Sequence, residues 1–72
     1  MQEQQDLNIT VNGEPLSVKS GTTISDLLVQ LKLNRRGIAV EINHEIEPGE
    51  NHDQRQVNDG DWLEIVTLVG GG

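Results

Sequence analysis

Alternation of apolar and polar residues predicts the first two strands. Residues 7–11 alternate in this way, which is the period-two pattern of a half-buried strand. Asn12-Gly13 follows at once, and both residues tolerate the positive φ angles of a tight turn. Residues 16–18 resume the alternation, with Pro15 near the strand start, where a missing donor does least harm. We therefore predict a β-hairpin at the start of the domain.

The next stretch has helical spacing. Thr22 or Thr23 offers an N-cap hydroxyl, and Asp26 follows Thr23 at the spacing of a capping box. Gly37, after this stretch, suits a left-handed cap or turn. The predicted helix has one apolar face, which closes the core and consists of Ile24, Leu27, Leu28 and Leu31.

The second half of the chain contains further strand patterns separated by turns. Residues 38–42 alternate and predict a third strand. Residues 44–61 are polar and irregular, with a short edge strand expected at Ile46, a turn at Pro48-Gly49 and one or two helical turns in 50–56. A turn at 58–61 then leads into the final strand.

This order of elements predicts an α+β domain in which a mixed four- to five-stranded sheet packs on one main helix. The layout is that of the β-grasp (ubiquitin-like) fold, in which the last strand lies centrally, parallel to the first. The apolar density of Leu63–Val69 agrees with a central position. We place a loose N-terminus at 1–6, the domain at 7–69 and a flexible glycine tail at 70–72.

Composition narrows the class of protein. The 72 residues suit one small domain, and without cysteine it has neither disulfides nor thiolate metal ligands. A net charge of -7 repels nucleic acid and anionic membranes and favours a basic protein partner, although plain solubility also explains it. We find no pattern of a membrane span or signal peptide, and expect a cytoplasmic protein that is monomeric when free.

The C-terminal end is the strongest candidate for chemistry. Gly70 and Gly71 can thread a narrow channel, carrying the carboxylate of Gly72 about 10 Å beyond the last strand. A frayed terminus is the alternative explanation. A stripe on the outer side of the final strand is predicted to dock a partner, unless loops cover it or the register is shifted by one residue. The residues of this stripe are Trp62, Val66 and Leu68.

Other polar residues are interpreted as structural. His44 and His52 match no spacing of metal ligands, so we predict solvated loop residues and no metal site. Asp59 and Asp61 could form an acid/base pair, but in a turn of this type we expect them to accept hydrogen bonds from nearby backbone N–H groups.

Several segments together resemble the ThiS family of sulfur carriers of the thiamine pathway. They occur in the family's order and cover Leu7 to Gly72, with departures at Glu47, at Gly49 and in the N-terminal extension. The segments are ITVNGEPLSV, GTTISDLLVQL, IAVEINHEIEP, NDGDWLEIV and the terminal VGGG.

The resemblance implies a protein co-substrate with no active site of its own. In such carriers a ubiquitin-activating-enzyme-like adenylyltransferase, using ATP and Mg²⁺ that it binds itself, adenylates the terminal carboxylate, here that of Gly72. Sulfur from a donor protein then makes a thiocarboxylate, and thiazole synthase accepts this sulfur. The chain itself is expected to bind no cofactor.

Three alternatives remain beside the thiazole carrier. A carrier of the molybdopterin pathway shares the fold, the tail and the activation, although AVEIN and DGDWLEIV favour the thiazole pathway. A ubiquitin-like modifier would join Gly72 to lysines of target proteins. A plain binding module would have an inert tail.

Overall fold

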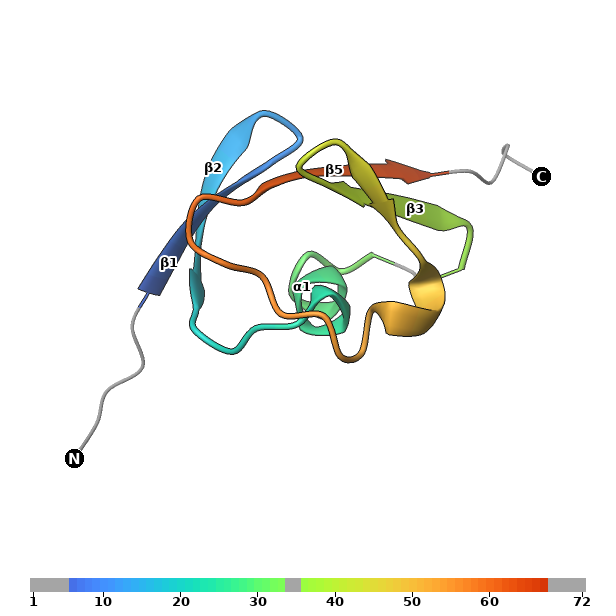
Figure 1. Cartoon of the computed structure of the whole chain (residues 1–72), viewed down its shortest axis with the longest axis horizontal. Helices are drawn as coiled ribbons and strands as arrows, with labels where there is room; N and C mark the ends of the chain where they lie inside the picture. Colours follow the sequence, from blue (N-terminus) through green and yellow to red (C-terminus); the bar gives the residue numbers. More distant parts are fainter. Residues whose placement is uncertain (1–5, 34–35, 68–72) are drawn as a thin grey trace.

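A five-stranded sheet lies over one helix in the computed structural model, which describes residues 6–33 and 36–67 (Figure 1). In chain order the elements are β1 (Asp6–Val11), β2 (Glu14–Lys19), α1 (Ile24–Gln30), β3 (Ile38–Ile42), β4 (Glu45–Glu47), the 3₁₀ helix η1 (Gly49–Asn51) and β5 (Trp62–Thr67). In the described ranges, no helix is long and apolar enough to cross a membrane.

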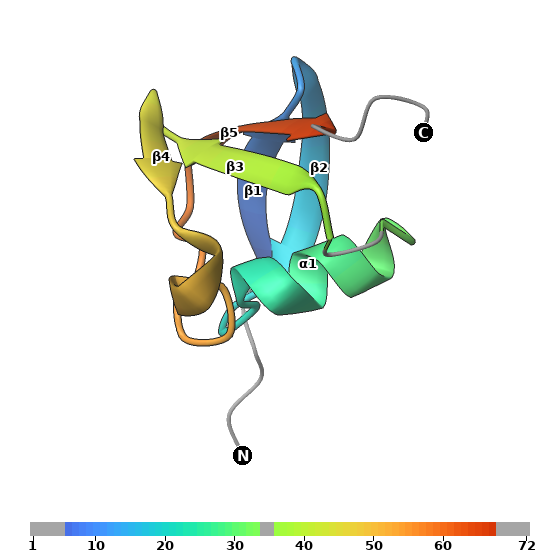
Figure 2. The same ribbon diagram turned by 90° about the vertical axis from the view of Figure 1, so that its right-hand side faces the viewer.

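The strand order confirms the predicted β-grasp fold. The strands lie in the order β2-β1-β5-β3-β4, so the last strand is central (Figure 2). β1 and β5 are parallel, whereas the other neighbouring pairs are antiparallel. β1 begins at Asp6, which the sequence had placed in the loose N-terminus. Asp6 pairs in register with Lys19 of β2, and its carboxylate lies 2.8 Å from the Lys19 ammonium.

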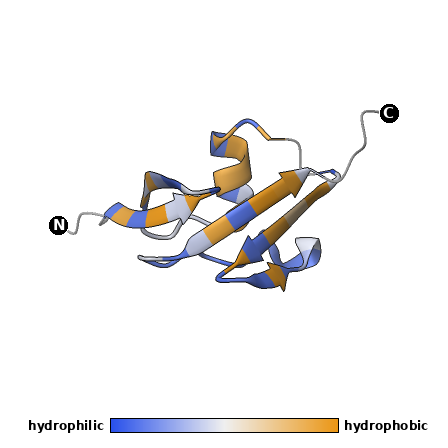
Figure 3. Cartoon of the chain, turned by 90° about the horizontal axis from the view of Figure 1, so that it is seen from above, coloured by the Kyte–Doolittle hydropathy of each residue, from blue (hydrophilic) through white to orange (hydrophobic). Residues whose placement is uncertain are grey.

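The core fills the space between the sheet and α1. Hydrophobic and hydrophilic residues alternate along the strands (Figure 3), and the hydrophobic ones on the inner face meet the helix. Val57, in the loop before β5, is a core residue that no local sequence pattern indicated. The buried apolar residues are Ile9, Val18, Ile24, Leu27, Leu28, Val40, Ile42, Val57 and Leu63.

The predicted start of α1 is confirmed. Thr23 is the N-cap, its hydroxyl accepts a hydrogen bond from the Asp26 backbone N–H at 3.0 Å, and the Asp26 carboxylate accepts one from the Thr23 N–H at 3.1 Å. This reciprocal capping box satisfies donors that the first helical turn leaves unpaired.

The end of α1 differs from the prediction. Lys32, with φ of 62°, takes the left-handed position at the helix end, so of the two roles expected for Gly37, a cap or a turn, only the turn is confirmed. Its N–H donates to the Val29 carbonyl at 3.0 Å, and the Leu33 N–H donates to the Leu28 carbonyl at 2.9 Å, which is a Schellman motif. These two hydrogen bonds offset the strain of a non-glycine residue there. Gly37, with φ of 68°, lies instead in the turn before β3.

The segment between β4 and β5 wraps the N-terminal end of α1 (Figure 1). The Ile24 N–H donates to the Arg55 carbonyl at 2.9 Å, and the Ser25 N–H donates to the His52 carbonyl at 3.0 Å. The Val57 N–H donates to the Thr22 carbonyl at 2.9 Å. Because these bonds tie the segment to the helix start, Val57 can enter the core.

The neighbouring residues Leu28 and Val29 test this packing. Leu28 is fully buried, whereas Val29 is 70% exposed. We expect Leu28→Ala to lower the free energy of unfolding by about 2–5 kcal/mol, since it leaves a cavity between the helix and the sheet. Val29→Ala should change it by less than about 0.5 kcal/mol. Urea unfolding followed by circular dichroism measures both, and equal losses would contradict the packing.

Candidate functional site

The central strand β5 is the last described element before the C-terminal glycines. It pairs with β3 from Leu63 to Thr67, but with β1 only at Trp62 and Leu63. Beyond Leu63, therefore, the edge of β5 that faces β1 no longer has a strand beside it.

The side chain of Asn12 covers this edge. Its Oδ1 accepts a hydrogen bond from the Ile65 N–H at 2.8 Å, and its Nδ2 donates to the Ile65 carbonyl at 3.3 Å. Its own backbone N–H donates to the Leu63 carbonyl at 2.9 Å. Asn12 has φ of 51° in the β1–β2 turn, so this one residue both forms the turn and replaces a strand partner of β5.

Asn43 likewise pairs with β5 through both its backbone and its side chain, at the edge that faces β3 and at the start of the strand. Its backbone N–H donates to the Trp62 carbonyl at 2.7 Å, and its Oδ1 accepts from the Trp62 N–H at 3.0 Å. Nδ2 of Asn43 donates to the Asp61 carboxylate at 3.1 Å. The sequence pattern indicated only the turn at Asn12 and gave no signal for the pairing of Asn43 with Trp62.

The turn before β5 behaves as predicted. Asp61 is buried, and its carboxylate accepts a hydrogen bond from the Asn58 N–H at 2.7 Å. The Asp59 carboxylate accepts one from the Asn8 N–H of β1, also at 2.7 Å. Both carboxylates are thus occupied with backbone groups, which confirms their structural interpretation.

The two histidines have different environments. His44 is exposed in the β3–β4 turn, as expected of a solvated loop residue. The same prediction is wrong for His52, which is buried with its Nε2 3.0 Å from the Glu47 carbonyl oxygen. The cause is the wrapping of the β4–β5 segment around α1, which no local sequence pattern indicated.

The outer face of β5 carries two of the three residues predicted to dock a partner. Trp62 is 43% exposed and Val66 is 50% exposed, while Leu63 between them is fully buried, so the predicted facing of these side chains is correct. Leu68 lies outside the described residues, as do Gly70, Gly71 and Gly72. Docking itself stays a prediction.

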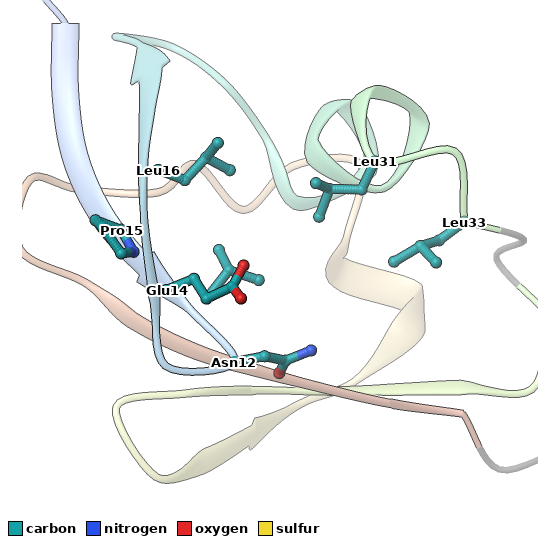
Figure 4. Close-up of a pocket in the computed structure, with 7 residues that line it drawn as sticks. Asn12, Glu14, Pro15, Leu16, Leu31 and Leu33 are labelled. Carbon is teal, nitrogen blue, oxygen red and sulfur yellow. The ribbon is translucent and has the colours of Figure 1, made fainter.

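A groove of about 290 Å³ opens elsewhere, between the β1–β2 hairpin and the end of α1 (Figure 4). Leu16, Leu31 and Leu33 make its lining largely aliphatic, so it is an opening of the core beside the Asn12 turn. No group of three or more histidine, cysteine, aspartate or glutamate side chains suited to a metal ion occurs in residues 6–33 and 36–67. The exit of β5 with its outer face is therefore the candidate site.

Comparison with known proteins identifies the family and the fold. The model of the ThiS family matches residues 8–72. The sulfur carrier protein ThiS of Bacillus subtilis is 38% identical over 65 residues, which cover 89% of this chain and 98% of that protein. The crystal structure of the thiamine biosynthesis protein ThiS from Geobacter metallireducens superposes with a TM-score of 0.75 at 36% identity, covering 92% of this chain and 100% of that one.

A longer protein also contains a similar segment. The thiazole synthase of Paramagnetospirillum magneticum is 42% identical over 66 residues, which are 92% of this chain. The chain spans 20% of the length of that synthase.

Removing the Asn12 side chain tests its hold on β5. We expect Asn12→Gly, which still accepts the positive φ, to lose about 1–2 kcal/mol of stability with its two hydrogen bonds. In hydrogen exchange the Ile65 amide should become less protected, while the Glu64 amide, which faces β3, should change less.

Asn12→Asp is the matched variant, because it keeps the acceptor for the Ile65 N–H and loses only the donor. It should protect the Ile65 amide better than Asn12→Gly does. Equal protection in the wild type and in Asn12→Gly would contradict the role of this side chain.

Proposed function

The chain belongs to the ThiS family, and we propose that it carries sulfur for thiazole formation in thiamine biosynthesis. The observation on which this rests is that the family match extends to residue 72 and so includes the glycines that follow the central strand. The names of the relatives, sulfur carrier ThiS and thiazole synthase, favour this pathway over the molybdopterin pathway.

The proposed reactive group is the carboxylate of Gly72. A carboxylate is ionised at neutral pH and is a poor electrophile. Attack of its oxygen on the α-phosphorus of ATP expels pyrophosphate and gives an acyl adenylate, from which a sulfur nucleophile can displace AMP. A ubiquitin-activating-enzyme-like adenylyltransferase would bind the ATP and Mg²⁺ and perform this step, and a donor protein would supply the sulfur.

The carrier's contribution is to present the tail. Gly70 and Gly71 have no side chains, so their backbone can approach a nucleotide closely. Ordering a flexible segment costs about 1–2 kcal/mol per residue, so docking of the folded domain has to offset that cost. Because Asn12 already holds Ile65 of β5 through two hydrogen bonds, only the residues after this strand should add to the entropy cost of docking.

In this function the chain is a co-substrate and not a catalyst. It would bind no cofactor and would act as a monomer in the cytoplasm, meeting the adenylyltransferase and then thiazole synthase. The similarity to a segment of a thiazole synthase supports that second partner, because a segment joined to an enzyme is kept at high effective concentration beside it.

Intact-mass and peptide mass spectrometry test the reaction. After incubation with the activating enzyme, ATP, Mg²⁺ and a sulfur source, the C-terminal peptide should gain the mass difference between one sulfur and one oxygen atom. Alkylation should trap this product as the thioacid derivative, which excludes oxidation of Met1 or Trp62. An unchanged mass, under conditions in which the Bacillus subtilis carrier reacts, would refute the proposal.

A bulky residue in the tail should block activation. We expect Gly71→Val to lower the rate of ATP–pyrophosphate exchange by about a hundredfold, because a branched side chain displaces the carboxylate in a narrow channel. Gly49→Val is the matched control, since a side-chain carbon there meets no atom within 4 Å and φ is not positive. Similar rates for the two variants would argue against threading.

A further inference from the structure

The outer face of the sheet combines apolar side chains with a pair of glutamates. Along β3 and β5, these outward-facing residues alternate with inward-facing ones. The strands β5, β3 and β4 are neighbours in the sheet, so their outward-facing residues form one continuous surface. We call this surface the outer patch. It consists of Ala39 and Glu41 on β3, Ile46 on β4, and Trp62, Glu64 and Val66 on β5.

Glu41 and Glu64 lie directly opposite each other in the antiparallel pairing of β3 with β5. Side chains at such positions have Cβ atoms about 4.5–5.5 Å apart, and like charges there destabilise a sheet. Both residues are half-buried, so water screens their carboxylates only in part. In the part of the chain that the structure describes, neither carboxylate has a hydrogen bond or an ion pair.

Two of the chain's own cations are engaged elsewhere. Lys19 pairs with Asp6 at 2.8 Å, and Arg55 pairs with Glu47 at 2.7 Å. Each of these carboxylates has an intramolecular cation, whereas the central pair of the outer patch has none among the described residues. The sheet therefore holds two facing negative charges at a cost to its own stability.

The surroundings of the pair suit a contact with another protein. Ile46 on β4 is 71% exposed and lies opposite Glu41 in the pairing of β3 with β4, and Trp62 and Val66 lie on either side of Glu64 along β5. Interfaces typically bury aromatic and aliphatic anchors around a few desolvated polar contacts. A planar guanidinium can donate to two carboxylates at once and also stack on an indole, which an ammonium does less well.

We propose that the outer patch docks thiazole synthase, an enzyme that in one relative contains a segment similar to this chain, and that an arginine of the synthase bridges Glu41 and Glu64 in the complex. This inference rests on the proposed function. It goes further by naming the carrier residues that recognise the synthase and by requiring an arginine on the synthase. The repulsion between the two carboxylates in the free carrier becomes attraction to the shared cation in the complex, which makes recognition dependent on charge.

The test compares binding with stability for three single substitutions of the full chain. Glu41→Gln and Glu64→Gln remove one carboxylate each. Glu50→Gln is the matched control, because it makes the same change of charge on the exposed η1, which lies beside α1 and away from the outer patch (Figure 2). Isothermal titration calorimetry with thiazole synthase from the same organism gives Kd at several salt concentrations.

We expect Glu41→Gln and Glu64→Gln to raise Kd about tenfold to a hundredfold and to weaken its salt dependence, while Glu50→Gln stays within about twofold of the wild type. In urea unfolding, the two patch variants should be at least as stable as the wild type, because each relieves the repulsion. Glu64→Lys, which places opposite charges across the strands, should be stable and should bind weakest.

The outcomes separate this inference from the proposed function. If the wild type binds and all three glutamine variants bind equally well, the arginine bridge is refuted while the carrier function stands. If parallel titrations show that the patch variants bind the activating enzyme more weakly but thiazole synthase as well as the wild type does, the choice of thiazole synthase is wrong. A loss of stability in Glu64→Gln would refute the repulsion. Absence of wild-type binding and of thiocarboxylate formation would instead refute the proposed function.

Discussion

The architecture depends on pairing β5 at both of its edges. Leu63 on this strand is fully buried, and the strand joins the β1–β2 hairpin to the β3–β4 hairpin in one sheet. Yet β1 and β5 share only the Thr10–Trp62 and Val11–Leu63 register positions. The side chain of Asn12 extends the pairing on that side, and Asn43 secures the start of the strand. The chain therefore leaves the sheet from a fixed position.

Holding the end of β5 in place suits a protein whose proposed reactive group lies at the C-terminus. A partner that binds the C-terminal end has fewer residues to order when β5 is already held up to Thr67, and each residue that need not be ordered saves conformational entropy. The domain achieves this without disulfides, using an aliphatic core closed partly by a loop residue, Val57. Hydrogen bonds from the β4–β5 segment to the start of α1 keep that loop in place.

The two faces of the sheet have different tasks. The inner face is aliphatic and supplies the stability, whereas the outer face keeps Trp62 and Val66 in contact with solvent and sets Glu41 opposite Glu64. Such an arrangement does not favour the free domain. It is understandable where a partner supplies the missing cation, since residues selected for binding often reduce stability.

Local patterns in the sequence were sufficient for the elements and for much of the topology. Period-two alternation, the Asn12-Gly13 turn, the Thr23 capping box and the helical spacing of Leu27 and Leu28 each depend on neighbours within a few residues, so the sequence alone determined them. The order of these elements then indicated the β-grasp fold, and the apolar character of the final strand indicated its central place.

Only the tertiary structure decided which distant residues meet. The burial of His52, the double role of Asn12 at the edge of β5 and the facing of Glu41 and Glu64 all arise between segments far apart in the chain. The end of α1 at Lys32 is likewise visible only in the structure, where the Lys32 and Leu33 N–H groups donate to the carbonyls of Val29 and Leu28. Strand register and loop packing minimise the energy of the whole domain, and a change of one residue in register would reverse which side chains reach solvent.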